Sequence, residues 1–268
     1  MKPIVIAGYV RSPFHFAKKG ALAGVRPDDL AAEVVKALVQ RTGADPATIE
    51  DLLMGNAFPE AEQGFNIARL VGLMAGLPIS VAGATLNRFC GSSMQSIHSA
   101  AGAIQMDAGE AFICAGVESM SRVPMTGFNP MPNPAFYKTN PGAYMGMGDT
   151  AENVARRWQI TRADQEAFAV TSHQKAASAQ AAGKFNGEIV GIHVASRRFL
   201  AKLGLEVPGG MVNFVGQLAL GIVIKPQQSF FHGFYLLDVF WSGCRFMTLP
   251  RKRAGCRRPF RCSPGRSL

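Results

Sequence analysis

Cys90 is the residue of this sequence best placed to do chemistry. It follows a predicted strand, Ala84–Phe89, and stands directly before a predicted helix of small residues, Gly91–Met106. A thiol at a helix N-terminus lies beside free backbone N–H groups and the positive end of the helix dipole, which favour the thiolate. Because the thiolate is the nucleophilic form of cysteine, this position predicts a nucleophile that needs no metal.

The other cysteines indicate no further chemistry. Cys114 lies inside the apolar run Ala111–Ala115 and is predicted to be a small core residue. The chain has five cysteines and no Cys-x-x-Cys pair, so neither a disulfide framework nor a zinc site is predicted. This cysteine usage favours the reducing cytoplasm.

Strand and helix signals alternate over the first 120 residues. The helix that follows the first strand starts at Arg26–Asp29, with proline and two acids in its first turn, and ends at Gly43. The alternation predicts an α/β fold in which helices pack on the faces of a sheet. The predicted strands are Ile4–Tyr9, Leu52–Asn56, Ala84–Phe89 and Phe112–Val117, and the other predicted helices are Asn66–Ala75 and Gly91–Met106.

A different composition begins at Pro124. Proline recurs up to Pro141 among Gly, Asn, Met and aromatic residues, which predicts an ordered loop excursion. Helix signals return at Thr150–Trp158. A longer helix is predicted from Thr161, where Thr161-x-x-Asp164 resembles a capping box, to Gly183.

Several segments of the sequence resemble the thiolase family of acyl-CoA acyltransferases. They are the nucleophile motif Asn87–Gln95, the signature Ala115–Pro124, and the loop-domain segments Met147–Ala155 and Ser172–Ala177. The resemblance runs from about residue 2 to residue 192. It implies a thiolase-like α/β core at 1–123, part of an inserted loop domain at 124–192, a layered αβα half without its second half, and a non-matching tail at 193–268.

The resemblance also implies an activity. The Cys90 thiolate would attack a 3-ketoacyl-CoA, release acetyl-CoA and hold the acyl group as a thioester until a second CoA removes it. The backbone N–H of Cys90 would form part of an oxyanion hole. Met147 would line the acyl pocket, and a glycine at position 146 slightly favours the degradative branch of the family. Family members are cytoplasmic homodimers or homotetramers that take acyl-CoA and CoA as substrates, with no permanently bound cofactor and no metal.

Three groups that complete a thiolase site have no match in this sequence. They are the general-base histidine of a Gly-His-Pro motif, the second cysteine of a Cys-x-Gly-Gly-Gly-x-Gly motif, and an oxyanion asparagine. His98 cannot replace the base, because eight helical residues place it about 12 Å along the axis from Cys90, beyond the ~3 Å that proton transfer requires. His173 is expected to be a structural or surface residue, and His15, His193 and His232 have no supporting context.

The tail differs in charge from the rest of the chain. Residues 1–192 carry 16 Lys and Arg against 16 Asp and Glu, whereas 193–268 carry 12 against 2, which accounts for the net charge of +10. Our preferred hypothesis is a reading-frame shift near residues 190–196 that leaves an inactive, poorly soluble or molten chain. An active thiolase is a second hypothesis. The third is a non-catalytic half whose basic, aromatic tail binds nucleic acid or an anionic membrane, although charge alone argues weakly for such a partner.

No targeting or membrane segment is predicted. The first apolar run, Met1–Gly8, is too short for a signal-peptide core and indicates a strand. The longest apolar stretch elsewhere, Met211–Ile224, falls short of the ~20 residues that span a bilayer.

Overall fold

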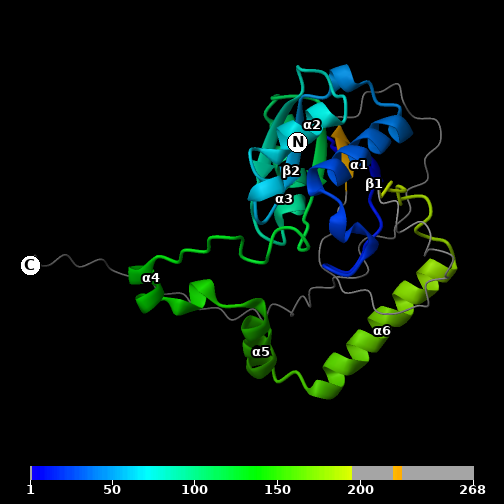
Figure 1. The fold of residues 1–268 in the computed structure, drawn as a ribbon. Coiled ribbons are helices and arrows are strands. Elements are labelled where there is room, and N and C mark those ends of the chain that lie inside the picture. The colour runs from blue at the N-terminus through cyan, green and yellow to red at the C-terminus, as the bar shows by residue number, and fades with distance from the viewer. Residues whose placement is uncertain (1, 195–219, 225–268) are drawn as a thin grey trace, which may run out of the picture. The chain divides into compact units, whose positions relative to one another are not determined.

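The computed structural model of the chain describes residues 2–194 and 220–224 (Figure 1). The described residues form a sheet with the strand order β1-β5-β4-β2-β3. These strands are β1 Val5–Val10, β2 Asp51–Gly55, β3 Ala82–Leu86, β4 Ala111–Gly116 and β5 Leu220–Ile224. Strand β2 is parallel to both β3 and β4, while β5 is antiparallel to β1 and β4. The predicted α/β class is confirmed.

Strand β5 corrects one expectation from the sequence. The segment after residue 192 has no clean alternation of polar and apolar residues, yet Leu220–Ile224 pairs along both edges within the sheet. Its sequence, Leu-Gly-Ile-Val-Ile, is rich in β-branched residues, which favour strands. The rest of the basic tail from residue 195 onward, with His232, lies outside the described residues.

The described helices follow the predicted order. The α-helices are α1 Pro27–Thr42, α2 Ile67–Met74, α3 Ser92–Gln105, α4 Pro134–Thr139, α5 Met147–Trp158 and α6 Arg162–Ala181. Short 3-10 turns lie at Ala21–Gly24, Pro46–Thr48, Ala61–Gln63 and Pro141–Tyr144. Helix α1 begins at Pro27 and is closed by Gly43 at φ +63°, a left-handed conformation that glycine adopts at little cost. No described helix is long and apolar enough to cross a membrane.

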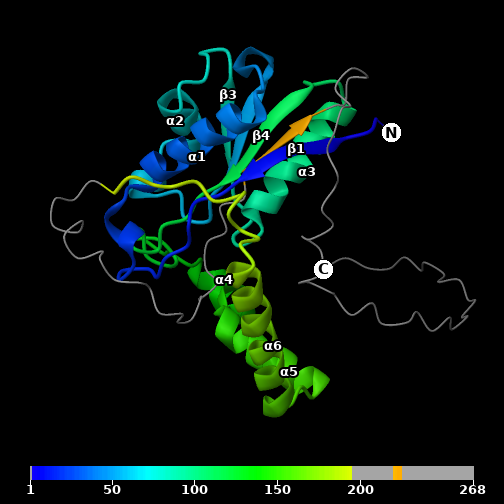
Figure 2. The same cartoon turned by 90° about the vertical axis from the view of Figure 1, so that its right-hand side faces the viewer.

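The two faces of the sheet are covered by different helices (Figure 2). Side chains alternate along each strand, so Leu52 and Met54 of β2 pack with α1 and α2 on one face. Leu53 of β2 and Cys114 of β4 pack with α3 on the other. This alternation gives the sheet one apolar cluster on each side and holds α3, the helix that follows Cys90, against β2 and β4.

Residues 124–184 form the excursion, which contains α4, α5 and α6, and none of these three helices buries a residue. Helix α6 begins with the predicted capping box, in which the Thr161 side chain accepts from Asp164 N and Asp164 accepts from Thr161 N. Helix α4 was not predicted. It forms because Asn133 caps the N–H of Phe136 and Pro134 occupies the first helical position.

The chain returns from the excursion to the core at residues 185–190. Val190 N donates to Arg11 O at 2.8 Å, and Arg11 N donates to Glu188 O at 2.8 Å. The side chains of Arg11 and Glu188 form an ion pair at 2.6 Å, and Glu188 is 6% exposed. Arg41 adds hydrogen bonds to the carbonyls of Gly187 and Ile189. Arg11 therefore fixes the point at which the excursion rejoins β1.

Candidate active site

Cys90 lies exposed in a tight turn between β3 and α3. Phe89, the residue before it, has φ +46°, a left-handed conformation that is uncommon for a side chain of this size. Gly91 N donates to Arg88 O, and Ser92 N donates to Phe89 O, both at 3.0 Å. The turn therefore presents the thiol outward at the start of α3, as the sequence predicted.

Ser92 holds this turn from the inside. Its side chain is buried, its Oγ accepts from Arg88 N at 2.8 Å, and its hydroxyl donates to Phe89 O at 2.6 Å. A hydroxyl that bonds to backbone groups on the chain before Cys90 restricts the turn to one conformation.

Two glycines allow α3 to start close to the sheet. A Cβ at Gly55, the last residue of β2, would overlap the backbone of Ser92 and Ser93. A Cβ at Gly116, the last residue of β4, would overlap the Ser93 side chain. The first turn of α3 can therefore lie over the carboxyl ends of β2 and β4 only because neither position has a side chain.

Asn87 connects the turn to the loop that follows β2. Its Oδ1 accepts from Phe89 N, and its Nδ2 donates to Ala57 O, both at 2.9 Å. The rings of Phe58 and Phe89 lie 6.1 Å apart and reinforce the same contact. The strained Phe89 is thus held through a polar and an aromatic contact.

Glu118, in the loop after β4, binds the other side of Ala57. Its Oε2 accepts from Ala57 N at 2.8 Å, and its Oε1 accepts from Gln63 Nε2 at 2.7 Å. Gln63 is fully buried, and its Oε1 accepts from Ser119 N at 2.6 Å. Burial raises the pKa of the Glu118 carboxyl above its ordinary value, opposed by the N–H donors of Ala57, Gln63 and Phe58.

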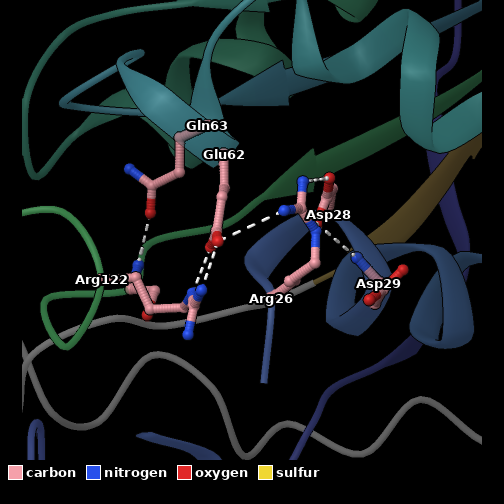
Figure 3. Close-up of polar contacts among 7 residues, drawn as sticks. Arg26, Asp28, Asp29, Glu62, Gln63 and Arg122 are labelled. Atoms are coloured by element: carbon pink, nitrogen blue, oxygen red, sulfur yellow. Dashed lines mark hydrogen bonds and ion pairs between the residues drawn. The ribbon is translucent and has the colours of Figure 1, made fainter. Parts of the chain in front are cut away.

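An ion-pair network ties the same loops together at the surface (Figure 3). Glu62 pairs with Arg122 through two hydrogen bonds and with Arg26 at 3.3 Å, while Arg26 pairs with Asp28 at 2.6 Å. The Arg122 hydrogen bond lowers the pKa of the Glu62 carboxyl. The network joins the start of α1 to the loops after β2 and β4.

Cys114 is a core residue, as predicted. It is 1% exposed on β4 and packs against α3, with its Sγ 3.5 Å from Ser96 O. Burial raises the pKa of the Cys114 thiol to about 12. The two described cysteines therefore differ sharply, since Cys90 is accessible and Cys114 is buried and protonated.

Comparison with known proteins identifies the family. The family model described as "Thiolase, N-terminal domain" matches residues 4–202. The chain belongs to the thiolase family. It is 51% identical over 194 residues to a 3-ketoacyl-CoA thiolase of Bacillus subtilis, and 44% identical over 191 residues to one of Psychrobacter cryohalolentis.

A solved structure agrees with this assignment. The crystal structure of the Bacillus anthracis acetyl-CoA acetyltransferase matches with a TM-score of 0.66 and 30% identity, covering 84% of this chain and 66% of that one. The matches to the Bacillus and Psychrobacter relatives cover 72% and 71% of this chain, and 50% and 49% of those proteins. This thiolase-family chain therefore spans about half the length of the curated relatives it matches.

The structure does not gather the other candidate residues of this thiolase-family chain around Cys90. His98 lies on α3 and is exposed, whereas Cys90 precedes the helix, which begins at Ser92. His173 is exposed on α6, and His193 is exposed after the return segment. Met147 is the first residue of α5 and is 69% exposed. Its expected role in an acyl pocket stays a prediction.

His15 belongs to a separate hollow. A cavity of about 270 Å³ lies between the loop after β1, which includes Phe14 and His15, and residues 118–121. Cys90 is not among the described residues that line it. No group of three or more His, Cys, Asp or Glu side chains in the described ranges is arranged to hold a metal ion.

Sequence reasoning missed the residues that support Cys90 from neighbouring loops. Asn87 belonged to the quoted motif, but its role was not assigned. The Asn87-x-Phe89 spacing is typical of an Asx turn and could have indicated the cap on Phe89. Glu118 and Gln63 are far from Cys90 in sequence, and only the parallel pairing of β2 with β3 and β4 brings their loops together.

Proposed function

We propose that Cys90 is the nucleophile of an acyl-CoA C-acyltransferase reaction. One observation carries the proposal: Cys90 is an exposed thiol in a constrained strand-to-helix turn within the matched thiolase domain. In thiolysis, the Cys90 thiolate attacks the keto carbonyl of a 3-ketoacyl-CoA, and the carbon–carbon bond beside it breaks. Acetyl-CoA leaves after its carbanion takes a proton, and the acyl group stays on the sulfur.

A second CoA completes the cycle. Its thiol loses a proton and attacks the Cys90 thioester, the new acyl-CoA leaves, and the Cys90 thiolate is restored; the proton released balances the one that the acetyl-CoA carbanion took up. The reverse sequence condenses two acetyl-CoA molecules. The backbone N–H of Cys90 is the proposed donor to a developing oxyanion.

The substrate class follows from the relatives. Those compared above are named 3-ketoacyl-CoA thiolase, and the solved structure is an acetyl-CoA acetyltransferase. We therefore propose 3-ketoacyl-CoA and CoA as substrates, with no permanently bound cofactor, and a place in fatty acid breakdown by β-oxidation. Met147 is the proposed acyl-pocket residue on the loop domain, 124–192.

We further propose that this chain does not turn over by itself. The sequence contains no Gly-His-Pro and no Cys-x-Gly-Gly-Gly-x-Gly motif to supply a base and a second thiol. Large apolar side chains are also uncovered on the excursion, among them Met147, Trp158 and Phe168 at 69%, 54% and 73% exposure. Such exposure supports a chain that associates or needs a partner surface. A homodimeric or homotetrameric, cytoplasmic full-length protein is part of the same proposal.

The test separates acyl transfer from turnover. The purified chain is incubated with acetyl-CoA, and acetyl groups are located on peptides by mass spectrometry. We expect up to one acetyl group, on Cys90, released CoA in the same amount, and no acetylation in Cys90→Ala or at Cys114. Acetoacetyl-CoA cleavage should not exceed the no-enzyme blank. Sustained cleavage that Cys90→Ala abolishes would overturn the proposed inactivity, and an unmodified Cys90 would overturn its role as nucleophile.

A further inference from the structure

Three loops meet beside the Cys90 turn, and hydrogen bonds join them in a fixed order. Glu118, from the loop after β4, accepts from Ala57 N at 2.8 Å. Ala57, from the loop after β2, accepts at its carbonyl from Asn87 Nδ2 at 2.9 Å. Asn87, from the loop after β3, accepts from Phe89 N at 2.9 Å. The residue beside Cys90 is thus linked to a carboxylate that does not itself contact the reacting thiol.

Phe89 connects these hydrogen bonds to Cys90, because its N–H donates to Asn87 and it directly precedes Cys90 in the chain. Its φ of +46° is unfavourable for a residue with a Cβ, so other contacts must hold it. The Asn87 cap satisfies its N–H, and the Ser92 hydroxyl donates to its carbonyl. If the cap is lost, the turn can relax, and the thiol is then no longer fixed at the start of α3.

Glu118 needs both of its carboxylate oxygens for this arrangement. One oxygen accepts from Ala57 N and the other from Gln63 Nε2. Gln63 cannot turn its amide round, because its Oε1 already accepts from Ser119 N and its Nε2 also donates to Phe58 O at 2.9 Å. An amide at position 118 would present a donor where an acceptor is required.

The ion pairs of Figure 3 brace the loops around this link without belonging to it. Glu62 and Arg122 join the loops after β2 and β4 near Gln63 and Glu118, and Arg26 adds the start of α1. Because these pairs hold the two loops at a fixed separation, Glu118 reaches Ala57 from an anchored backbone. The Glu118 end of this link is therefore braced by the ion pairs.

We propose that Glu118 is a positioning residue for Cys90, acting through Ala57 and Asn87 to hold the nucleophile at the N-terminus of α3. This inference rests on the proposed role of Cys90 as nucleophile. Glu118 transfers no proton in it and contacts no substrate. Its effect is to keep the exposed thiol at the start of α3, beside the positive end of the helix dipole.

The experiment measures the alkylation rate of Cys90 by iodoacetamide on the full chain, resolved by peptide mass spectrometry. Rates are compared at about pH 7 and at about pH 10, where free cysteine thiols are ionised without help. For Glu118→Gln we expect the pH 7 rate to fall about twofold to fivefold, the range that loss of a helix-terminus interaction produces, with the pH 10 rate unchanged. A merely structural loosening would not change the ratio of the two rates in this direction.

A double-mutant cycle tests the route. In an Asn87→Ala background, Glu118→Gln should cause no further loss, because the link is already broken. Glu60→Gln is the matched control: it makes the same chemical change in the loop after β2, but its carboxylate accepts from Phe128 N, away from the turn. Glu60→Gln should leave the Cys90 rate ratio unchanged.

Cys114 reports on folding in the same samples. It is buried, so alkylation of Cys114 marks a variant whose core has opened. If Glu118→Gln opens the core, Glu118→Asp replaces it, since the shorter carboxylate cannot reach both partners. An unchanged ratio, or an equal loss with and without Asn87, would overturn the positioning role. If wild-type Cys90 reacts at pH 7 no faster than a free cysteine thiol, the proposed nucleophile itself fails.

Discussion

The sheet core, residues 2–123, and the excursion, residues 124–184, are built from helices of similar regularity but differ in what surrounds them. Helices α1, α2 and α3 each bury apolar residues against the sheet, whereas α4, α5 and α6 bury none. Cys90 lies in the first region and Met147 in the second. The chain alone therefore positions its proposed nucleophile but leaves its proposed acyl-pocket residue uncovered.

The free energy of unfolding should differ most between two alanine variants, one of a core residue and one of an excursion residue. Leu38 of α1 is fully buried in the apolar cluster, so Leu38→Ala should lower the free energy of unfolding by about 3–4 kcal/mol. Phe168 of α6 is 73% exposed, so Phe168→Ala should change it by less than about 0.5 kcal/mol. Urea unfolding followed by circular dichroism measures both. Equal losses would mean that the excursion packs in solution.

The ion pair between Arg11 and Glu188, where the excursion returns to the core, should give the next largest change in stability. Arg11→Ala leaves the nearly buried Glu188 carboxylate without its partner and should cost about 2–3 kcal/mol, less than a fully buried pair. The return segment should then open, so that trypsin cleaves after the exposed Lys184 faster than in the wild type. Cleavage after Lys175, within α6, serves as the control and should not change. Unaltered cleavage at Lys184 would mean that other contacts hold the segment.

A pair of glycines distinguishes crowded from open backbone. Gly55→Ala places a methyl group against the first turn of α3 and should cost about 2 kcal/mol and slow Cys90 alkylation. Gly148 of α5 has open space within 4 Å of the point that a Cβ would occupy, so Gly148→Ala should stabilise that helix by up to about 0.5 kcal/mol. Thermal unfolding measures both changes. A neutral Gly55→Ala would show that α3 can move away from β2.

The smallest effect is a difference in the sign of a pH dependence. Burial raises the pKa of Asp51 at the start of β2, and its Oδ1 lacks a hydrogen-bond partner among the described residues. The Thr161 hydrogen bonds lower the pKa of Asp164 at the start of α6. From about pH 2 to about pH 6, the core should therefore lose stability through Asp51, while α6 gains helix stability through Asp164.

Matched substitutions separate these two titrations. Asp51→Asn should remove the core's loss, which is about 0.5 kcal/mol after screening of this partly exposed carboxyl. Asp164→Asn should remove the gain of helical circular dichroism at 222 nm as the pH rises. A core stability that rises over the same interval in the wild type, and still does so after Asp164→Asn, would contradict the assignment for Asp51.

The sequence predicted those parts of the fold that local interactions determine. Helix α1 has Pro27 at its start and Gly43 at its end, and α6 has the Thr161 capping box, so their bounds were close to the observed ones. Helix α4 was missed because its proline-rich surroundings indicated a loop. Strand β5 was missed because its pattern depends on neighbours on both sides, which a local reading does not contain.

The candidate site likewise has one part that local sequence predicts and one part that depends on strand pairing. Cys90 was found because a cysteine at a strand-to-helix junction is recognisable from adjacent residues. The link through Glu118, Ala57 and Asn87 joins three loops that are separated by about 30 residues each along the chain, and its distances exist only once the strands pair. Motif reading locates Cys90, while strand order decides which residues support it.

The position of β5 in the sheet has a consequence for synthesis. Among the described strands, β1 forms its ladder with β5 alone, so Val5 and its neighbours pair with residues 220–224. At roughly 5–20 residues per second, a ribosome needs about 10–40 s to make the intervening chain. During that time β2, β3 and β4 can assemble with one another, whereas the first strand to be made is the last to find its partner. The edge of β1 therefore stays unpaired until β5 is made, and during this interval a chaperone or a neighbouring nascent chain can bind it.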